Sequence, residues 1–371
     1  MMIQSDNSMF VSKCAFVDGD DLWMLTNETN ILCRFDFRKM ELQDYYVIPV
    51  RKITSNEHLS VCKGNNHVFV LPYLGTDMYV LDINTGQLEK EALPFSEEEK
   101  TKLGKLIISV FYNGKLYILG HSVKGIFCYN PEHNSWTGSS YAYLEDIKNE
   151  GIDIEKPFLN DCFYMSEGNL YTPIDKTNLF IRFDLNSLSH DILKINGNYR
   201  LRTIDCIDGE KFLFSTYDEE RIVWSFSKGI EDERCLNVTD VEEKAFMRVF
   251  FRNGKFYYIS ANERRVFVET NGEIQELFFD YEDNDIFPVG LTQFEAIFIN
   301  EENIYFQARY NGQLFYIDTM DDSIHKLNIA VNKEKKAEVY SSFYRNLHNR
   351  IVITENNIFG LGDFIRITQG I

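Results

Sequence analysis

The sequence repeats one pattern along most of its length: a strand-like apolar run, a tight turn rich in Gly, Asn, Asp or Glu, and a second run with an aromatic residue near its start. Runs such as SVFYNGKLYIL and VFFRNGKFYYIS, placed around a turn that tolerates positive φ, predict β-hairpins. The turns are spaced by about 48 residues on average. Their centres are Gly19, Asn66, Gly114, Gly168, Gly209, Gly254, Glu302 and Asn356.

A second marker has the same period. Each hairpin is followed by a third strand that ends in a polar turn, as in RFDFRKM (34–40) and VLDINTGQ (80–87), and most units then continue into a fourth strand. Long apolar stretches at helical spacing are nearly absent, which excludes a helical solenoid. Four-stranded units of this length are typical of propeller blades. We therefore predict an all-β, closed β-propeller with eight blades, and with seven if one unit is irregular.

The two ends of the chain suggest how the ring closes. The last unit reaches its third-strand turn at Gln369-Gly370 without a fourth strand, whereas the first unit already has four and is preceded by Met2–Val11. An open array would leave exposed strand edges. We expect Met2–Val11 to supply the missing outer strand, so that residues 1–371 form a single propeller domain.

One unit resembles a known repeat. Val110–Gly120, followed by Cys128–Trp136, resembles a Kelch repeat of the galactose-oxidase-like propeller class. The glycine doublet of that repeat has no counterpart here, and Gly120-His121 is the nearest approach. The resemblance implies the fold and transfers no active site, since no residues match the copper ligands or the crosslinked cofactor of galactose oxidase.

The charge balance excludes some partners. The chain carries 38 Lys and Arg against 57 Asp and Glu, a formal net charge of −19. Such a surface repels nucleic acids and anionic membranes. The seven cysteines are scattered without a CxxC pair, the N-terminus lacks a signal-peptide pattern, and no run of about 18 apolar residues occurs. We therefore expect a soluble, cytoplasmic protein, with the monomer as the default state.

The candidate site lies on the face formed by the blade-to-blade loops and the loops between second and third strands, because rigid rings present variable loops there. The longest predicted loops are Ser96–Lys105, Tyr141–Asn160, Phe279–Gln293 and Ala330–Asn346. Residues just before first strands or just after second strands should surround the mouth of the central funnel. They are Arg51, His58, Tyr73, His121, Arg200, Arg202, Tyr217, Arg248, Arg309, Tyr310, Arg345 and His348.

Arginines that converge on one mouth of so acidic a protein would attract an anionic ligand or a carboxylate-bearing peptide. The alternative is that they pair with neighbouring acids such as Asp161, Asp205 and Glu295 and only tie blades together. Tyr and Arg are also the residues enriched at binding hot spots.

Metal and nucleophile chemistry has little support. His58, His121 and His348 could meet at the axis, but no HxH, HxxE or HExxH pair occurs, so we predict no metal and no cofactor. Four cysteines fall on predicted first strands. One interpretation is that they form a reactive thiol cluster. The favoured interpretation is that they are small apolar residues that fit the crowded inner strands. These cysteines are Cys14, Cys62, Cys162 and Cys206.

Two functions remain open. The first is a non-catalytic binding module that recognises a partner protein or peptide, or a small anionic ligand, on the funnel face. The second is an enzyme that acts on an anionic substrate by lyase-type proton transfer, with arginines holding a carboxylate while Tyr or His moves the proton. The absence of a catalytic signature favours the binding module, although propellers host both classes.

Overall fold

The turns that set the repeat are built from residues that accept a left-handed backbone. In four hairpins both turn residues have positive φ, as a two-residue type I′ turn requires: Asn113-Gly114, Glu167-Gly168, Asn253-Gly254 and Asn271-Gly272. The twist of such a turn matches the twist of the strands beside it. The predicted hairpins around Gly114, Gly168 and Gly254 are therefore confirmed.

The structure is a computed structural model that describes residues 10–27, 29–49, 58–72, 77–94, 106–120, 125–140, 143–151, 159, 162–238, 246–279, 293–309 and 311–348. Within these ranges it does not describe the side chains of residues 58, 59, 106, 107, 125, 139, 140, 143–145 and 343–348. No helix of these residues is long and apolar enough to span a bilayer.

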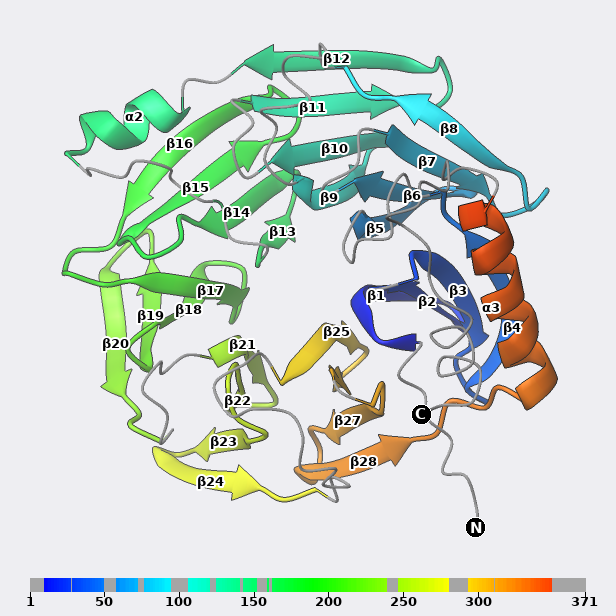
Figure 1. Cartoon of the computed structure of the whole chain (residues 1–371). Helices are drawn as coiled ribbons and strands as arrows, with labels where there is room; N and C mark the ends of the chain where they lie inside the picture. The colour runs from blue at the N-terminus through cyan, green and yellow to red at the C-terminus, as the bar shows by residue number, and fades with distance from the viewer. Residues whose placement is uncertain are drawn as a thin grey trace, which may run out of the picture.

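The described strands form seven four-stranded antiparallel sheets arranged as blades around a central axis (Figure 1). Each sheet contains consecutive strands, with the first innermost and the fourth outermost. Blade I contains β1 Ser12–Asp18, β2 Asp21–Thr26, β3 Ile31–Asp36 and β4 Glu41–Val47. Blade II contains β5 His58–Gly64, β6 His67–Pro72, β7 Asp77–Asp82 and β8 Leu88–Ala92. Blade III contains β9 Leu106–Tyr112, β10 Lys115–Gly120, β11 Gly125–Asn130 and β12 Ser135–Ser140. Blades IV and V are β13 Tyr164–Ser166, β14 Asn169–Pro173, β15 Leu179–Asp184, β16 Ser189–Lys194; β17 Leu201–Cys206, β18 Lys211–Thr216, β19 Glu220–Ser225 and β20 Gly229–Cys235. Blades VI and VII are β21 Phe246–Arg252, β22 Lys255–Ser260, β23 Val266–Thr270, β24 Glu273–Leu277; β25 Phe294–Asn300, β26 Asn303–Ala308, β27 Leu314–Asp318 and β28 Ser323–Leu327.

The core is divided into seven hydrophobic clusters, one between each pair of neighbouring blades, including blades VII and I. The second strand of each blade is buried on both faces, and its alternate side chains pack against the two different neighbouring blades. In β2, Leu22 and Met24 pack toward blade VII, whereas Trp23 and Leu25 pack toward blade II. Because side chains alternate across a strand, one apolar run supplies two interfaces.

The prediction of eight blades is wrong, and the structure has seven. An eighth blade would have to lie between blades VII and I, but Phe298 and Tyr305 of blade VII already share a core cluster with Leu22 and Met24 of blade I. After β28 the chain forms helix α3 (Lys333–His348), which takes up most of the predicted loop Ala330–Asn346 and ends two residues beyond it. Residues 351–371, the predicted eighth unit, lie outside the described residues.

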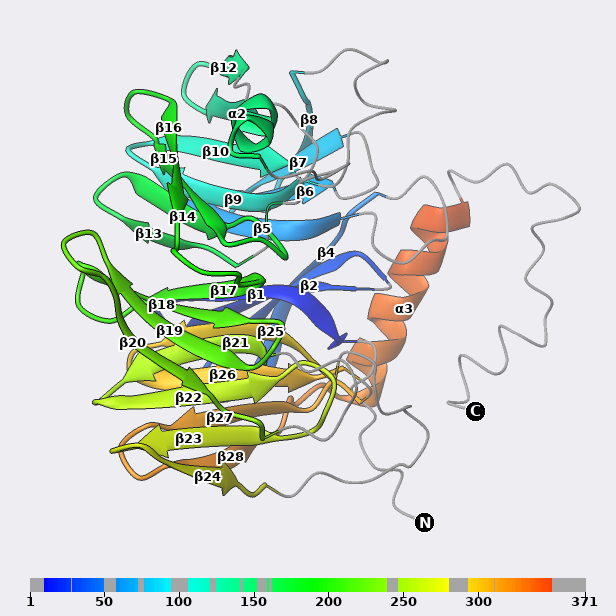
Figure 2. The ribbon, with the colours of Figure 1, turned by 90° about the vertical axis from the view of Figure 1, so that its left-hand side faces the viewer.

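Helix α3 packs against the outer strand of blade I (Figures 1 and 2). The Tyr45 hydroxyl of β4 is 2.9 Å from both Glu338 Oε1 and Ser342 Oγ, and Val339 is buried in the cluster between blades VII and I. Just before the helix, Ala330 pairs with Glu41 in a parallel bridge. The segment after blade VII therefore crosses the junction between the last and first blades.

Ring closure by a strand from Met2–Val11 is not observed, because blade I and blade VII each obtain all four strands locally. Of that segment only Phe10 and Val11 are described, and Phe10 is fully buried. Besides the hydrophobic cluster, the buried Gln307 amide of β26 joins the two blades by hydrogen bonds. Its Oε1 accepts the Ser12 N–H at 2.8 Å, and its Nε2 donates to the carbonyls of Phe10 (3.0 Å) and Gly312 (2.9 Å).

The polar turns after third strands also have a physical explanation. Asp36, Asp82 and Asp184 end β3, β7 and β15, and one carboxylate oxygen of each accepts two backbone N–H groups of the turn at 2.8 to 3.3 Å. This side chain-to-backbone turn fixes the hairpin to the fourth strand. The hydrogen bonds favour the ionised form, so they lower the pKa of all three carboxyl groups.

We expect Gln307→Leu to destabilise the ring by about 2 to 4 kcal/mol, because it leaves three buried backbone groups without partners while keeping a similar volume. The free energy of unfolding measured in urea tests this, with exposed Gln43→Leu as the control at about 0.5 kcal/mol or less. Equal effects of the two substitutions would contradict the role of Gln307 in closure.

The three turn carboxylates should make stability depend on acidity. A lowered folded-state pKa gives stability that is present above the unfolded pKa, about 3.9, and is lost as pH falls through the folded value. The triple variant Asp36→Asn, Asp82→Asn, Asp184→Asn keeps an acceptor oxygen but cannot titrate. Its unfolding free energy should therefore change less between pH 7 and pH 3 than that of the wild type.

The matched control for the acid experiment is Glu210→Gln, Glu273→Gln, Glu301→Gln, which removes the same charge from exposed side chains that accept no backbone N–H among the described residues. If both triple variants flatten the pH dependence equally, general charge repulsion explains the effect and the turn hydrogen bonds do not.

Candidate functional site

The seven inner strands surround a central cavity of about 1430 Å³. Its lining comes mainly from the first strand of each blade, which places residues far apart in sequence on one wall (Figure 1). Polar and charged side chains line it together with aromatic rings, so apolar residues do not plug it.

Bulges shape the wall near the start of the inner strands. Strands β1, β17 and β21 each carry one extra residue at the same place, which is Lys13, Arg202 or Met247, and all three line the cavity. In β25 the irregularity includes Ala296, whose φ of 47° is strained for a residue with a Cβ. Bulges change the direction in which side chains point. We call the wall formed by the bulge positions Lys13, Arg202, Met247 and Ala296 the channel mouth.

On one side of the channel mouth, Arg202 faces an aromatic ring. Its guanidinium lies 4.8 Å from the centroid of Tyr217, which comes from the loop after β18, and its Nε donates to the Phe246 carbonyl at 2.8 Å. The Tyr217 hydroxyl donates to Asp175 Oδ1 at 2.7 Å. Burial raises the pKa of Tyr217, the nearby Arg202 opposes that shift, and the hydrogen bond to Asp175 adds to it. Tyr217 is therefore neutral and its ring is held between charged neighbours.

The outer edge of the Arg202 guanidinium is available to a ligand. Besides the Phe246 carbonyl, the guanidinium contacts the Tyr217 side chain and Met247 Sδ, a weak acceptor at 3.8 Å. Among the residues that the structure describes, no carboxylate lies within ion-pairing distance of the Arg202 guanidinium. Arg200, two residues earlier, differs: its guanidinium makes two hydrogen bonds with Asp218 at 2.7 and 3.0 Å.

Across the opening from β17, the wall near β1 and β25 is already paired (Figure 1). Glu295 is 1% exposed, and its Oε1 lies 3.0 Å from Lys13 Nζ and 3.1 Å from Arg309 Nε. The Asn27 amide donates to its other oxygen at 3.4 Å. Two cations share one carboxylate, so this group has a net positive charge and ties blade VII to blade I.

Two further ion pairs lie toward the other end of the inner strands. Lys63 pairs with Asp18 between blades I and II, and Arg252 pairs with Asp205 between blades V and VI at 3.1 Å. Burial raises the pKa of Asp205, and Arg252 reduces that shift. Both pairs join neighbouring blades. Asp205 therefore ties blades together, but its partner is Arg252 and not one of the predicted mouth arginines.

The structure brings together three of the predicted mouth residues, Arg202, Tyr217 and Arg248, on the cavity wall. Arg200 and Arg309 pair with the acids Asp218 and Glu295, but each pair lies within one blade, so neither ties blades together as the alternative expected. Arg345 and His348 belong to α3 and not to the start of a blade, and their side chains, like that of His58, are not described. The remaining candidates lie outside the described residues: Arg51, Tyr73, His121, Tyr310 and the acid Asp161.

Sequence reasoning missed Lys13 and Asp175. Asp175 follows a second strand, as Tyr217 does, so the signal for it was present in the sequence. Lys13 reaches the mouth through a β-bulge, and nothing in its neighbouring residues predicts an extra residue there.

The inner-strand cysteines are structural. Cys14, Cys62 and Cys162 line the cavity, while Cys206 is buried outside its lining. The Cys162 thiol donates to the Ile204 carbonyl of the next blade at 3.4 Å. Burial raises the pKa of Cys62 to about 12, so at neutral pH almost none of it is the reactive thiolate.

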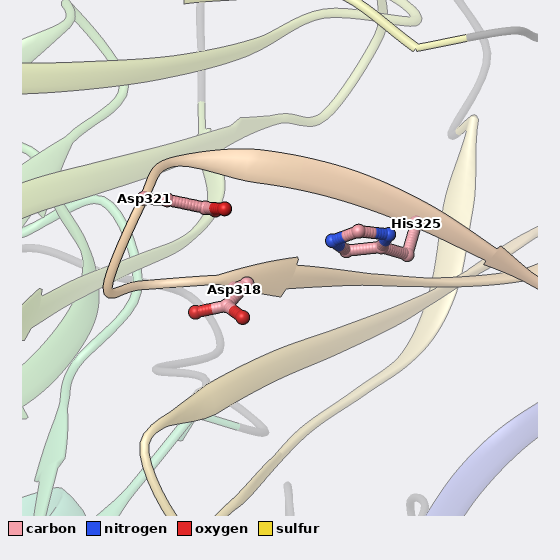
Figure 3. Close-up of side chains that lie close together, drawn as sticks. All are labelled: Asp318, Asp321 and His325. Carbon is pink, nitrogen blue, oxygen red and sulfur yellow. The ribbon is translucent and has the colours of Figure 1, made fainter.

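One group of side chains has a spacing that could suit a metal ion. Figure 3 shows Asp318, Asp321 and His325 at the β27–β28 turn, with ligand atoms within 4.8 Å of one another. The turn already uses all three. Asp318 and Asp321 accept the N–H groups of Met320 and Ser323 at 2.9 Å, and His325 lies 2.6 Å from the Ser323 hydroxyl. Local hydrogen bonding therefore explains the cluster.

Comparison with known proteins identifies the fold and nothing narrower. No family model matches the chain, and no curated protein matches its sequence. Virginiamycin B lyase from Staphylococcus aureus superposes with a TM-score of 0.59 at 11% identity, covering 82% of this chain and 94% of that one. The Cps50 (Swd1) β-propeller domain of Myceliophteria thermophila gives 0.58 at 10% identity (86% and 97%), and YCF48 bound to D1 peptide gives 0.57 at 10% (83% and 93%). The chain is a seven-bladed β-propeller, and no family match supports the Kelch-type repeat.

Proposed function

We propose that this propeller is a non-catalytic binding module that takes a carboxylate-bearing segment of a partner protein at the channel mouth. The observation that carries the proposal is Arg202. A bulge places it on the cavity wall, a backbone carbonyl fixes its orientation, and its outer edge has no carboxylate among the described residues.

The geometry suits a planar anion. Nε donates to the Phe246 carbonyl, so a carboxylate whose paired oxygens bind the two terminal nitrogens has to displace only the contacts with Met247 Sδ and the Tyr217 side chain. Lys176 Nζ lies 5.3 Å from the Tyr217 ring, so it adds positive charge near Arg202. The charge of Arg200 is offset by its ion pair with Asp218. On a protein of net charge −19, this positive region would direct an acidic segment to one place.

A second candidate function, an enzyme acting on an anionic substrate, is favoured by one observation. The Tyr217 hydroxyl and Asp175 Oδ1 are 2.7 Å apart beside Arg202, so a proton could move between them next to a bound anion. Both kinds of function occur among the structural neighbours, which include a lyase and a protein bound to a peptide. The fold does not decide between them.

Arg202→Gln should reduce partner capture at least about tenfold, because a hot-spot arginine contributes more than 1.4 kcal/mol to binding. Arg200→Gln is the matched control: it removes the same charge two residues away, where the guanidinium is held by exposed Asp218. Proteins recovered from native lysate by wild type and by Arg200→Gln, and lost with Arg202→Gln, would be quantified by mass spectrometry. Equal capture by all three forms, or capture of nothing, contradicts the proposal.

Tyr217→Phe separates the two candidate functions. It keeps the ring under Arg202 and removes the hydroxyl proton. We expect partner binding to change less than about threefold. We also expect no Tyr217-dependent loss of any anionic compound when the protein is incubated with a metabolite extract and followed by mass spectrometry. Turnover by the wild type that Tyr217→Phe abolishes would establish the enzyme instead.

A further inference from the structure

The cavity wall contains a partly exposed aromatic side chain that contacts no other aromatic ring of the described residues. Phe163, directly before β13, lines the cavity and is 36% exposed. It belongs to none of the seven core clusters, and no ring of the described residues lies in contact with its ring. Its neighbour Tyr164 differs, since that ring packs against Tyr171 and Phe212 at 6.4 and 6.2 Å.

Phe163 lies on the same wall as Arg202. The Cys162 thiol donates to the Ile204 carbonyl at 3.4 Å and accepts the Ile204 N–H at 3.4 Å, so the start of β13 is joined to β17. Phe163 follows Cys162 by one residue, and Arg202 precedes Ile204 by two. The partly exposed Phe163 ring and the Arg202 guanidinium therefore belong to neighbouring blades, IV and V, and line the same cavity.

We infer that the recognised segment carries a large apolar side chain next to its acidic residue, which rests on the function proposed above. An apolar group that covers Phe163 gains hydrophobic contact. It also excludes water from the neighbouring ion pair, which strengthens that pair by lowering the local dielectric. A carboxylate flanked by Gly or Ser would use Arg202 alone and leave Phe163 in water.

The test is selection of peptides from a displayed random dodecapeptide library on wild type, Arg202→Gln, Phe163→Ser and Phe278→Ser. Phe278 is 86% exposed outside the cavity lining, so its substitution is the matched control for loss of an exposed ring. Circular dichroism and melting temperature confirm that each variant folds. Wild type and Phe278→Ser should enrich an acidic residue adjacent to Phe, Leu, Tyr or Trp.

A double-mutant cycle then compares one enriched peptide with its Gly form, in which the apolar residue is replaced by Gly. The affinities of both peptides are measured by fluorescence polarisation. Phe163→Ser should weaken the first peptide about five- to tenfold and leave the Gly form unchanged, which shows that the two apolar groups interact. Arg202→Gln should weaken both peptides.

Each other outcome has a defined meaning. If Arg202→Gln weakens binding but Phe163→Ser does not, or if acidic residues are enriched without an apolar neighbour, the inference is wrong and the proposed function stands. If wild type enriches no acidic sequence, the proposed function fails and the inference fails with it.

Discussion

The structure depends on burial of both faces of its middle strands. A four-stranded sheet with two apolar faces cannot leave either face in water, so each blade requires a neighbour on both sides. Seven hydrophobic clusters satisfy this requirement around the ring, and the seventh joins the last blade to the first. Closure is thus a consequence of hydrophobic burial, and the central cavity exists because seven first strands meet around one axis.

Much of the fold could be predicted from the sequence, because its signals are local. Turn pairs such as Asn113-Gly114 encode a hairpin, and Asp36 and its equivalents encode the next turn through their own hydrogen bonds. The number of blades is not local. Residues 351–371 carry the same strand-like pattern as the true blades, but packing of Phe298 against blade I leaves no space for another sheet. Periodicity identifies units that could form blades, and tertiary packing selects those that do.

The candidate site was predicted in part for the same reason. Position relative to strand ends placed Arg202 and Tyr217 on the cavity wall. It could not separate Arg202 from Arg200, because partner choice depends on which carboxylates the folded chain brings near. Bulges are also invisible in a single sequence, so Lys13 was missed. Phe163 was not identified from the sequence, because the exposed fraction of an apolar side chain depends on how neighbouring blades pack around it.

The group formed by Lys13, Glu295 and Arg309 has a consequence for the mechanics of the ring. Lys13 belongs to the first blade and Glu295 to the last, and no sheet is shared across that seam. A ligand that bound Lys13 or Glu295 would therefore change the stability of the contact between blades VII and I. By thermodynamic linkage, a change in the stability of that contact would change the affinity for the ligand by the same free energy.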